Sequence, residues 1–187
     1  TVFGDLPYGN PDYQTHFGQT TTLIRGVEQF GKLWVFDFNV LAGCPVGLIF
    51  DVDNKAHFLF TYGLHQLGVP ISVGFNLFGA ITVLIAPFSL WLATRLFHMG
   101  RRGQLFALGL GILVWHFDSS ARMCWAGGMI SFATVSHLSL LIWALFYRML
   151  EARKTRYLWP LLLLLPLALH THVWAFGILV VPLIGLY

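Results

Sequence analysis

The chain has 187 residues, of which 57% are hydrophobic and 10% charged, and its mean hydropathy is +0.71. Soluble domains have roughly 25% charged residues, so this composition excludes an ordinary soluble protein. The formal net charge of +3 does not indicate nucleic-acid binding, because the basic residues lie at the ends of apolar segments and form no single stripe. We therefore expect an all-α integral membrane protein: a polytopic helical bundle with a long external loop carrying amphipathic helices.

The predicted external loop, residues 1–68, holds six of the eight acidic side chains. In residues 13–33, apolar side chains recur near a period of 3.6, which predicts an amphipathic helix lying along a membrane surface. Pro11 and Asp12 indicate its start, and Gly31 indicates its end. This segment is too polar to cross a bilayer.

A turn-rich connector is expected at residues 39–47, because two glycines and a proline there disfavour regular structure. A second short helix is expected at residues 57–67. From residue 69 to residue 187 the chain is mostly apolar, which predicts a bundle of about four to five spans. The segments that we expect are spans at 69–97, 105–115 and 129–147, a polar break at 116–128, and the apolar stretch 158–187.

The apolar stretch 158–187 is too long for one ordinary span. As a single helix it would measure about 45 Å, against a hydrocarbon core of about 30 Å. Two short helices that meet at His170, Thr171 and His172 fit the bilayer better, and one long tilted helix is the alternative. The chain begins without methionine and ends within this apolar stretch, so we expect a fragment of a longer protein with further helices on both sides.

Basic residues give the expected orientation in the membrane. Since cytoplasmic loops are enriched in lysine and arginine, the two basic ends should be cytoplasmic. The loop 1–68, the break 116–128 and the turn at His170–His172 would then meet on the external face, in what we expect to be the bacterial inner membrane. The seven residues at the basic ends are Arg95, Arg101, Arg102, Arg148, Arg153, Lys154 and Arg156.

Two groups in the loop could carry chemistry. Asp12 and His16 are four residues apart and share a helix face, so they could act as general base and orienting imidazole, or simply as an N-cap and a surface histidine. Asp51, Asp53 and His57 could bind a divalent cation such as Mg²⁺ or Mn²⁺ through hard ligands, or the two carboxylates could lie in a solvated turn.

Three cationic or titratable side chains of the apolar region could bind a substrate phosphate. Arg122 is the one arginine in the break 116–128, where it could clamp a phosphate or pair with Asp118. His170 and His172 are polar residues in an otherwise apolar stretch, which favours a functional role. Cys44 and Cys124 could form one disulfide, although the sequence favours two unlinked thiols.

A family resemblance follows from several of these features together. An acidic residue, a D-x-x-x-H helix start, a tryptophan, a G-x-P-x-G connector and then a membrane helix resemble the first external loop of GT-C-type polytopic glycosyltransferases. Residues 125–132 and the Thr171–His172 turn are similar to the starts of later helices in that family. The matching loop residues are Asp5, Asp12–His16, Trp34 and Gly43–Gly47.

The resemblance implies an enzyme that moves a sugar from a polyprenyl-phosphate carrier to an acceptor on the external face. It implies Asp12 as the base, with Asp5 second, and Arg122 and His172 near the carrier phosphate. Where relatives have an aromatic-proline-proline run, this chain has Phe50–Asp53, which indicates a metal-using variant or a non-catalytic relative.

Two other functions stay open from the sequence. The chain could be a non-catalytic accessory subunit of a larger membrane complex, binding haem or pigment through His170, His172 or His137. A transporter fragment is a third interpretation, because the 158–187 stretch is broken. In each case the partners are membrane lipid and neighbouring membrane subunits, and not nucleic acid.

Overall fold

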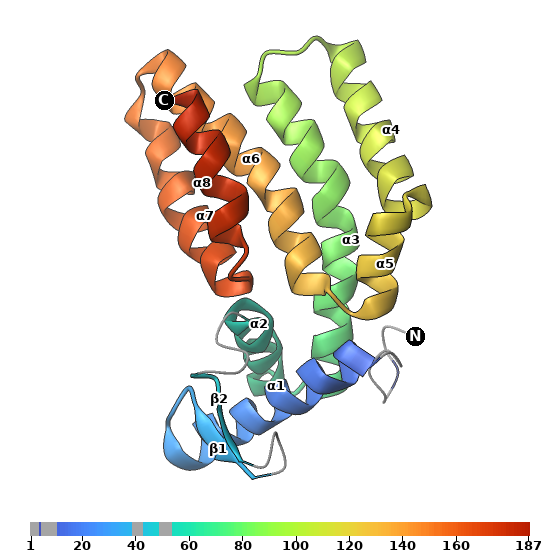
Figure 1. Cartoon of the computed structure of the whole chain (residues 1–187), viewed down its shortest axis with the longest axis vertical. Coiled ribbons are helices and arrows are strands. Elements are labelled where there is room, and N and C mark those ends of the chain that lie inside the picture. The colour runs from blue at the N-terminus through green and yellow to red at the C-terminus, as the bar shows by residue number, and fades with distance from the viewer. Residues whose placement is uncertain (1–3, 5–10, 39–42, 49–53) are drawn as a thin grey trace. The chain divides into compact units, whose positions relative to one another are not determined.

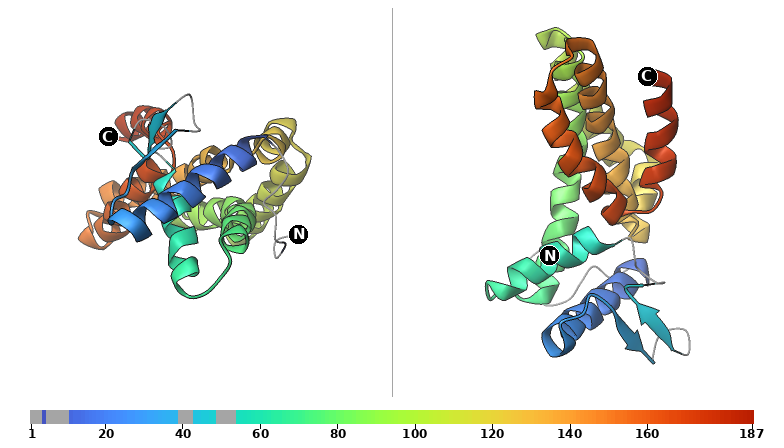
Figure 2. Two further views of the ribbon diagram at one scale, coloured as in Figure 1. Left: turned by 90° about the horizontal axis from the view of Figure 1, so that it is seen from below. Right: turned by 90° about the vertical axis from the view of Figure 1, so that its left-hand side faces the viewer.

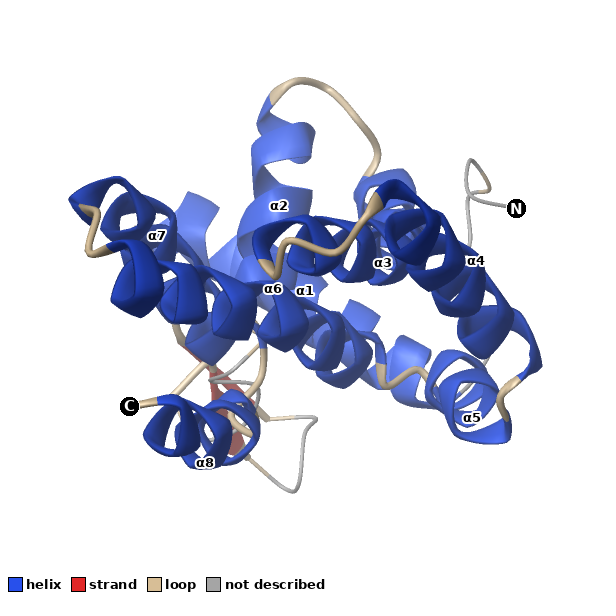
Figure 3. Cartoon of the chain, turned by 90° about the horizontal axis from the view of Figure 1, so that it is seen from above, coloured by secondary structure: helices blue, strands red, loops and turns tan. Residues whose placement is uncertain are grey.

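Most of the chain is helical in this computed structural model, as expected, and the structure describes residues 4, 11–38, 43–48 and 54–187. Figure 3 shows helices throughout and, in the described part, one pair of short strands. The chain divides into two compact units. Unit 1 comprises Thr1–Ala80 and Ala126–Met129, and unit 2 comprises Ile81–Trp125 and Ile130–Tyr187.

Unit 1 is built around the helix α1, Pro11–Phe30. The amphipathic helix and both of its end signals are confirmed: after Phe30, Gly31 adopts a φ of +63° and donates a hydrogen bond to the Val27 carbonyl oxygen at 2.9 Å. α1 packs against α2, Lys55–Gln66, which confirms the second predicted helix. The buried residues that hold the two helices and the nearby strand together are Leu23, Ile24, Val46 and Phe58.

A two-stranded hairpin packs on α1, so the prediction of irregular structure at residues 39–47 was wrong for its second strand. Strand β1, Val35–Asp37, pairs antiparallel with β2, Cys44–Val46, and Figure 2 shows both strands beside α1. Alternation explains the pairing, because Cys44 and Val46 are buried while Pro45 between them is partly exposed. A proline is tolerated here because each strand of a two-stranded sheet is an edge strand.

α3, Ile71–Leu96, confirms the first long apolar helix, and it runs on from unit 1 into unit 2. α4, Arg101–Phe117, extends the predicted second segment at both ends. The break 116–128 is more regular than expected, because it contains a nine-residue helix, α5, Ser119–Gly127. α4 approaches α3 closely: a methyl group added at Gly111 would lie 3.0 Å from the Pro87 Cα.

α6, Ile130–Ala152, lies between α3 and the last two helices in unit 2 (Figure 1). After the short 3₁₀ turn η1, Thr155–Tyr157, the chain forms α7, Leu158–Thr171, and α8, Ala175–Leu186. The expected pair of short helices is thus confirmed, and the single long helix is excluded. The core formed by α6, α7 and α8 consists of Val135, Ile142, Leu145, Leu161, Ala168, Ala175 and Leu179.

Two helices, α3 and α6, are long and apolar enough to cross a membrane, and α8 is a shorter apolar helix. The hydroxyl groups of Thr82 on α3 and Thr134 on α6 lie 2.9 Å apart and are both buried, so they join these two helices by a hydrogen bond. The Thr134 hydroxyl also donates to the Ile130 carbonyl oxygen of its own helix at 2.8 Å.

Candidate functional site

Asp12 and His16 lie on the first two turns of α1. The helix starts at Pro11, a residue whose fixed φ suits the first helical position, and Asp12 follows where the positive end of the helix dipole favours a carboxylate. The Asp12 side chain is exposed, and that of His16 is half-buried. Their spacing places a carboxylate and an imidazole on one helix face, within reach of the same ligand.

The turn between α5 and α6 lies against this end of α1. Gly128 is buried with a φ of +88°, and a methyl group added there would lie 2.8 Å from both the Asp12 Cβ and the Tyr13 backbone nitrogen. Only glycine meets both demands, because a side chain would strain this backbone conformation and has no room. Two of the three polar segments that we expected to converge are therefore in contact within unit 1.

Asn54 fixes the orientation of the His16 ring. Asn54 is the N-cap residue of α2, yet its side chain makes no capping hydrogen bond. Its Nδ2 instead donates to His16 Nδ1 at 3.3 Å, so the neutral imidazole carries its proton on Nε2. His16 thereby presents an N–H donor of the kind that suits a phosphate or sugar oxygen. This role of Asn54 was not predicted from the sequence, because an asparagine before a helix normally caps that helix.

His57 is a structural residue at the junction of α2 and α3. Its ring is 3% exposed and stacks between Phe75 and Phe78, with 4.2 Å between ring centroids in each case. Its Nε2 donates to the Phe75 carbonyl oxygen at 3.2 Å. Burial lowers the pKa of His57 from 6.5 to about 3, and it outweighs the raising effect of the hydrogen bond to Phe75. The ring is therefore neutral at pH 7.

The predicted metal site is described only in part. Asp51 and Asp53 lie outside the described residues, as does Asp5, so their roles stay predictions. Only Nδ1 of His57 is left for a cation, because Nε2 donates to the Phe75 carbonyl oxygen. Phenylalanine rings stack on both faces of the imidazole, and this apolar surrounding does not fit a metal ligand in a hydrated loop. Across the described ranges, no three His, Cys, Asp or Glu side chains gather in a group that could hold a metal ion.

The three predicted phosphate-binding residues belong to unit 2. Arg122 is exposed on α5, and His170 is exposed in the last turn of α7. His172 follows α7 in an extended conformation, and its Nδ1 accepts a hydrogen bond from the Trp174 backbone nitrogen at 3.2 Å. Its ring meets the edge of Phe132 near the start of α6, with centroids 5.5 Å apart. His170 and His172 are therefore held differently and do not form a paired ligand set.

Two further titratable groups lie near α4. His137 on α6 meets the ring of Trp115 edge-on at 4.9 Å between centroids, and its buried Nε2 makes no hydrogen bond within the described part of the chain. Cys124 is half-buried on α5, where burial and then the charge of Asp118 raise the pKa of its thiol. Cys124 and Cys44 are both free thiols, as the sequence favoured.

The two predicted basic ends meet at one end of unit 2, which we call the basic end. His98, after α3, lies 3.7 Å from the Glu151 carboxylate of α6, measured from Nε2 to Oε2. Phe97 and Tyr147 join the same two segments, with ring centroids 5.1 Å apart. Both arginine-rich segments therefore lie at one end of this unit, and the side of the membrane that they face stays a prediction.

No protein-family model, curated protein or solved structure matches this chain. The chain is mostly helical, and within its described ranges two helices could cross a membrane. Its candidate site is the start of α1, with Asp12 exposed, His16 oriented by Asn54 and Gly128 packed against the backbone.

Proposed function

We propose that the chain is a polytopic integral membrane protein. Apart from α3 and α6, the helices of unit 2 expose large apolar side chains that water would disfavour over so wide an area. Phe106 of α4 is 73% exposed, Leu163 of α7 is 70% exposed and Val181 of α8 is 73% exposed. A hydrocarbon surrounding satisfies these surfaces, and it also accounts for a chain with 10% charged residues.

We further propose that it is a GT-C-type glycosyltransferase, which moves a sugar from a polyprenyl-phosphate carrier to an acceptor on the external face. In the proposed step, Asp12 accepts the proton of an acceptor hydroxyl while the acceptor oxygen attacks the sugar C1. The bond from C1 to the phosphate oxygen breaks with inversion, and polyprenyl phosphate leaves.

The observation that carries the proposal is the arrangement around Asp12. An exposed carboxylate stands at the positive end of α1 and shares a helix face with His16, and Gly128 is packed against its backbone. A base must be held in place to work, and this packing restricts the helix start on one side. His16, with its proton on Nε2, orients the acceptor or the phosphate. Asp5 is proposed to assist Asp12, and Arg122, His170 and His172, which belong to unit 2, stay predicted contacts of the carrier phosphate.

The test is sugar transfer by the purified chain in lipid vesicles, with radiolabelled polyprenyl-phosphate hexose and pentose donors. Removing a general base lowers the rate by about 10²–10⁴-fold, so Asp12→Asn should lose at least about 100-fold in kcat. Asp37→Asn is the matched control, because Asp37 accepts a hydrogen bond from the Thr22 hydroxyl at 3.2 Å on the hairpin and has no proposed role. Unchanged turnover in the double variant Asp5→Asn, Asp12→Asn would remove the mechanism.

A second candidate function is a non-catalytic subunit that binds haem or pigment through His137. The observation that favours it is the buried Nε2 of His137, which lacks a hydrogen bond within the described residues. An absorbance spectrum of the purified chain tests it directly. A Soret or chlorin band that His137→Phe abolishes would support this function, and a featureless visible spectrum would exclude it.

A further inference from the structure

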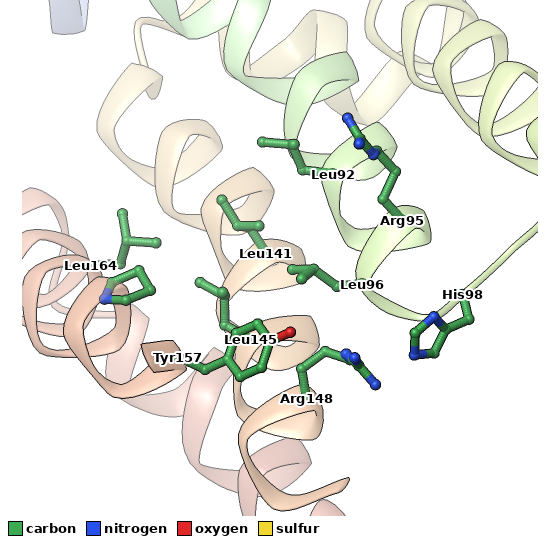
Figure 4. A pocket seen from close by; sticks show the side chains of 10 residues that line it. Leu92, Arg95, Leu96, His98, Leu141, Leu145, Arg148, Tyr157 and Leu164 are labelled. Carbon is green, nitrogen blue, oxygen red and sulfur yellow. The ribbon is translucent and has the colours of Figure 1, made fainter. Parts of the chain in front are cut away.

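The basic end of unit 2 contains a cavity of about 520 Å³, and its lining residues come from α3, α6 and the η1–α7 segment (Figure 4). Half of its lining residues are leucines. Figure 4 shows leucines of α3, α6 and α7 around the cavity, with Tyr157 beside Leu145, His98 and Arg148 on one side, and Arg95 beside Leu92. The apolar lining residues are Leu92, Leu96, Leu141, Leu145 and Leu164. The cavity thus combines a leucine wall with a few cationic and polar side chains.

Guanidinium groups converge on the rim. Arg156 donates a hydrogen bond to the Tyr157 hydroxyl oxygen at 2.7 Å, and its Cζ lies 4.8 Å from the centre of the tyrosine ring. The Arg148 Cζ lies 5.6 Å from the same ring, and Arg148 pairs with Glu151. Hydrogen bonds from Arg156 and Arg148 lower the pKa of Tyr157, so this rim favours a negatively charged oxygen.

The charge of this end is unbalanced. It carries seven of the eleven lysines and arginines but only one acidic residue, Glu151. Arg95 lines the cavity and is exposed, and its Cζ lies 5.1 Å from the ring of Trp91. The single carboxylate cannot neutralise the arginines around it, so the rim has unused capacity for an anion.

We propose that this cavity binds the phosphodiester of an anionic phospholipid at Arg148 and Tyr157, with one acyl chain along the leucine wall and with Arg95 adding positive charge to the cavity. A lipid meets both halves of the site, since its headgroup is anionic and its chain is apolar. Basic pockets between membrane helices on the cytoplasmic side are suited to such headgroups. The proposal rests on the membrane embedding of unit 2 and is independent of the sugar-transfer reaction.

Binding of fluorescent dioleoyl phosphatidylglycerol to the full chain in nonionic detergent micelles tests the proposal. We expect saturable binding, competed by unlabelled phosphatidylglycerol and much less by dioleoyl phosphatidylcholine. One arginine near an anionic headgroup contributes about 1 kcal/mol, so Arg95→Gln and Arg148→Gln should each weaken binding about fivefold. Arg102→Gln is the matched control, because Arg102 is exposed at the same end but does not line the cavity.

Three outcomes would overturn the proposal. If Arg102→Gln weakens binding as much as Arg95→Gln, the attraction is a diffuse charge effect and not a site. If glycerol phosphate at millimolar concentration displaces the lipid fully, the site recognises phosphate alone. If Leu96→Trp, which fills the leucine wall and keeps every charge, leaves binding unchanged, no acyl chain occupies the cavity. Since Arg95 is exposed, its variant stays informative even if Arg148→Gln fails to fold.

Discussion

Replacing Gly128 by alanine should destabilise the protein more than any neighbouring glycine substitution. A left-handed backbone costs a residue with a side chain about 1–2 kcal/mol. The new methyl group would also lie 2.8 Å from the Asp12 Cβ and the Tyr13 nitrogen, closer than such atoms approach, and overpacking of this kind costs about 1–3 kcal/mol. We therefore expect Gly128→Ala to lower the free energy of unfolding by about 2–5 kcal/mol.

Thermal unfolding in detergent measures this loss, which corresponds to a fall in Tm of roughly 4–20 °C for a chain of this size. Gly127→Ala is the control next to it, because nothing lies within 4 Å of its added methyl group, and alanine is the better helix former at the end of α5. Gly128→Ala should also lower the rate of sugar transfer under conditions in which the variant is still folded, since moving Asp12 misplaces the base. Equal Tm values for the two variants would refute the proposed contact between Gly128 and α1.

Other residues give three further predictions. His57 binds protons more weakly in the folded than in the unfolded state. Its contribution to stability is therefore complete above pH 6.5, and the free energy of unfolding falls by up to about 1.4 kcal/mol per pH unit as the pH drops from 6.5 toward 3. His57→Phe, which keeps the ring stacking, should flatten this dependence in denaturant titrations. Thr82→Val should lower the free energy of unfolding by about 0.5–1 kcal/mol, because the Thr134 hydroxyl keeps its hydrogen bond to the Ile130 carbonyl oxygen. A larger loss in the same denaturant titration would mean that the hydroxyl pair has another role. Thiol titration of the unfolded chain without reductant should find two reactive cysteines per chain, whereas none would reveal a disulfide.

The helices could be predicted because the residues that start and end a helix agreed with the period of the apolar side chains between them. Pro11 and Gly31 bounded α1 correctly, since a proline at the first helical position and a glycine after the last are set by backbone geometry alone. The division of the last stretch at His172 followed from length, because one helix would exceed the bilayer. These features depend on residues close together in the sequence.

The hairpin could not be predicted in the same way. β1 and β2 have three residues each, which is too short for a clear alternating pattern, and Pro45 argued against a strand. What stabilises them is burial of Val46 against α1 and α2, a contact between segments distant in the sequence. The helix α5 was not predicted either, because its polar composition indicated a break between spans and its apolar residues show no helical period.

For the candidate site, the sequence identified the residue types but not their partners. The spacing of Asp12 and His16 gave a shared helix face, and nothing local linked Asn54 to His16 or Gly128 to Asp12. His57 shows the opposite case. Its position near two aspartates left a metal ligand as one of two interpretations, whereas the structure places its ring between two phenylalanines of α3.

We propose that α3 crosses the membrane, with α1 outside the cell and the basic end inside. Single cysteines at two exposed positions, Gln14→Cys and Arg102→Cys, placed in a background with both native cysteines replaced by alanine, test it with a membrane-impermeant maleimide on intact cells. We expect Gln14→Cys to be labelled from outside, and Arg102→Cys to be labelled only after permeabilisation. Labelling of both positions from outside, or of Arg102→Cys alone, would contradict the topology on which the proposed chemistry depends.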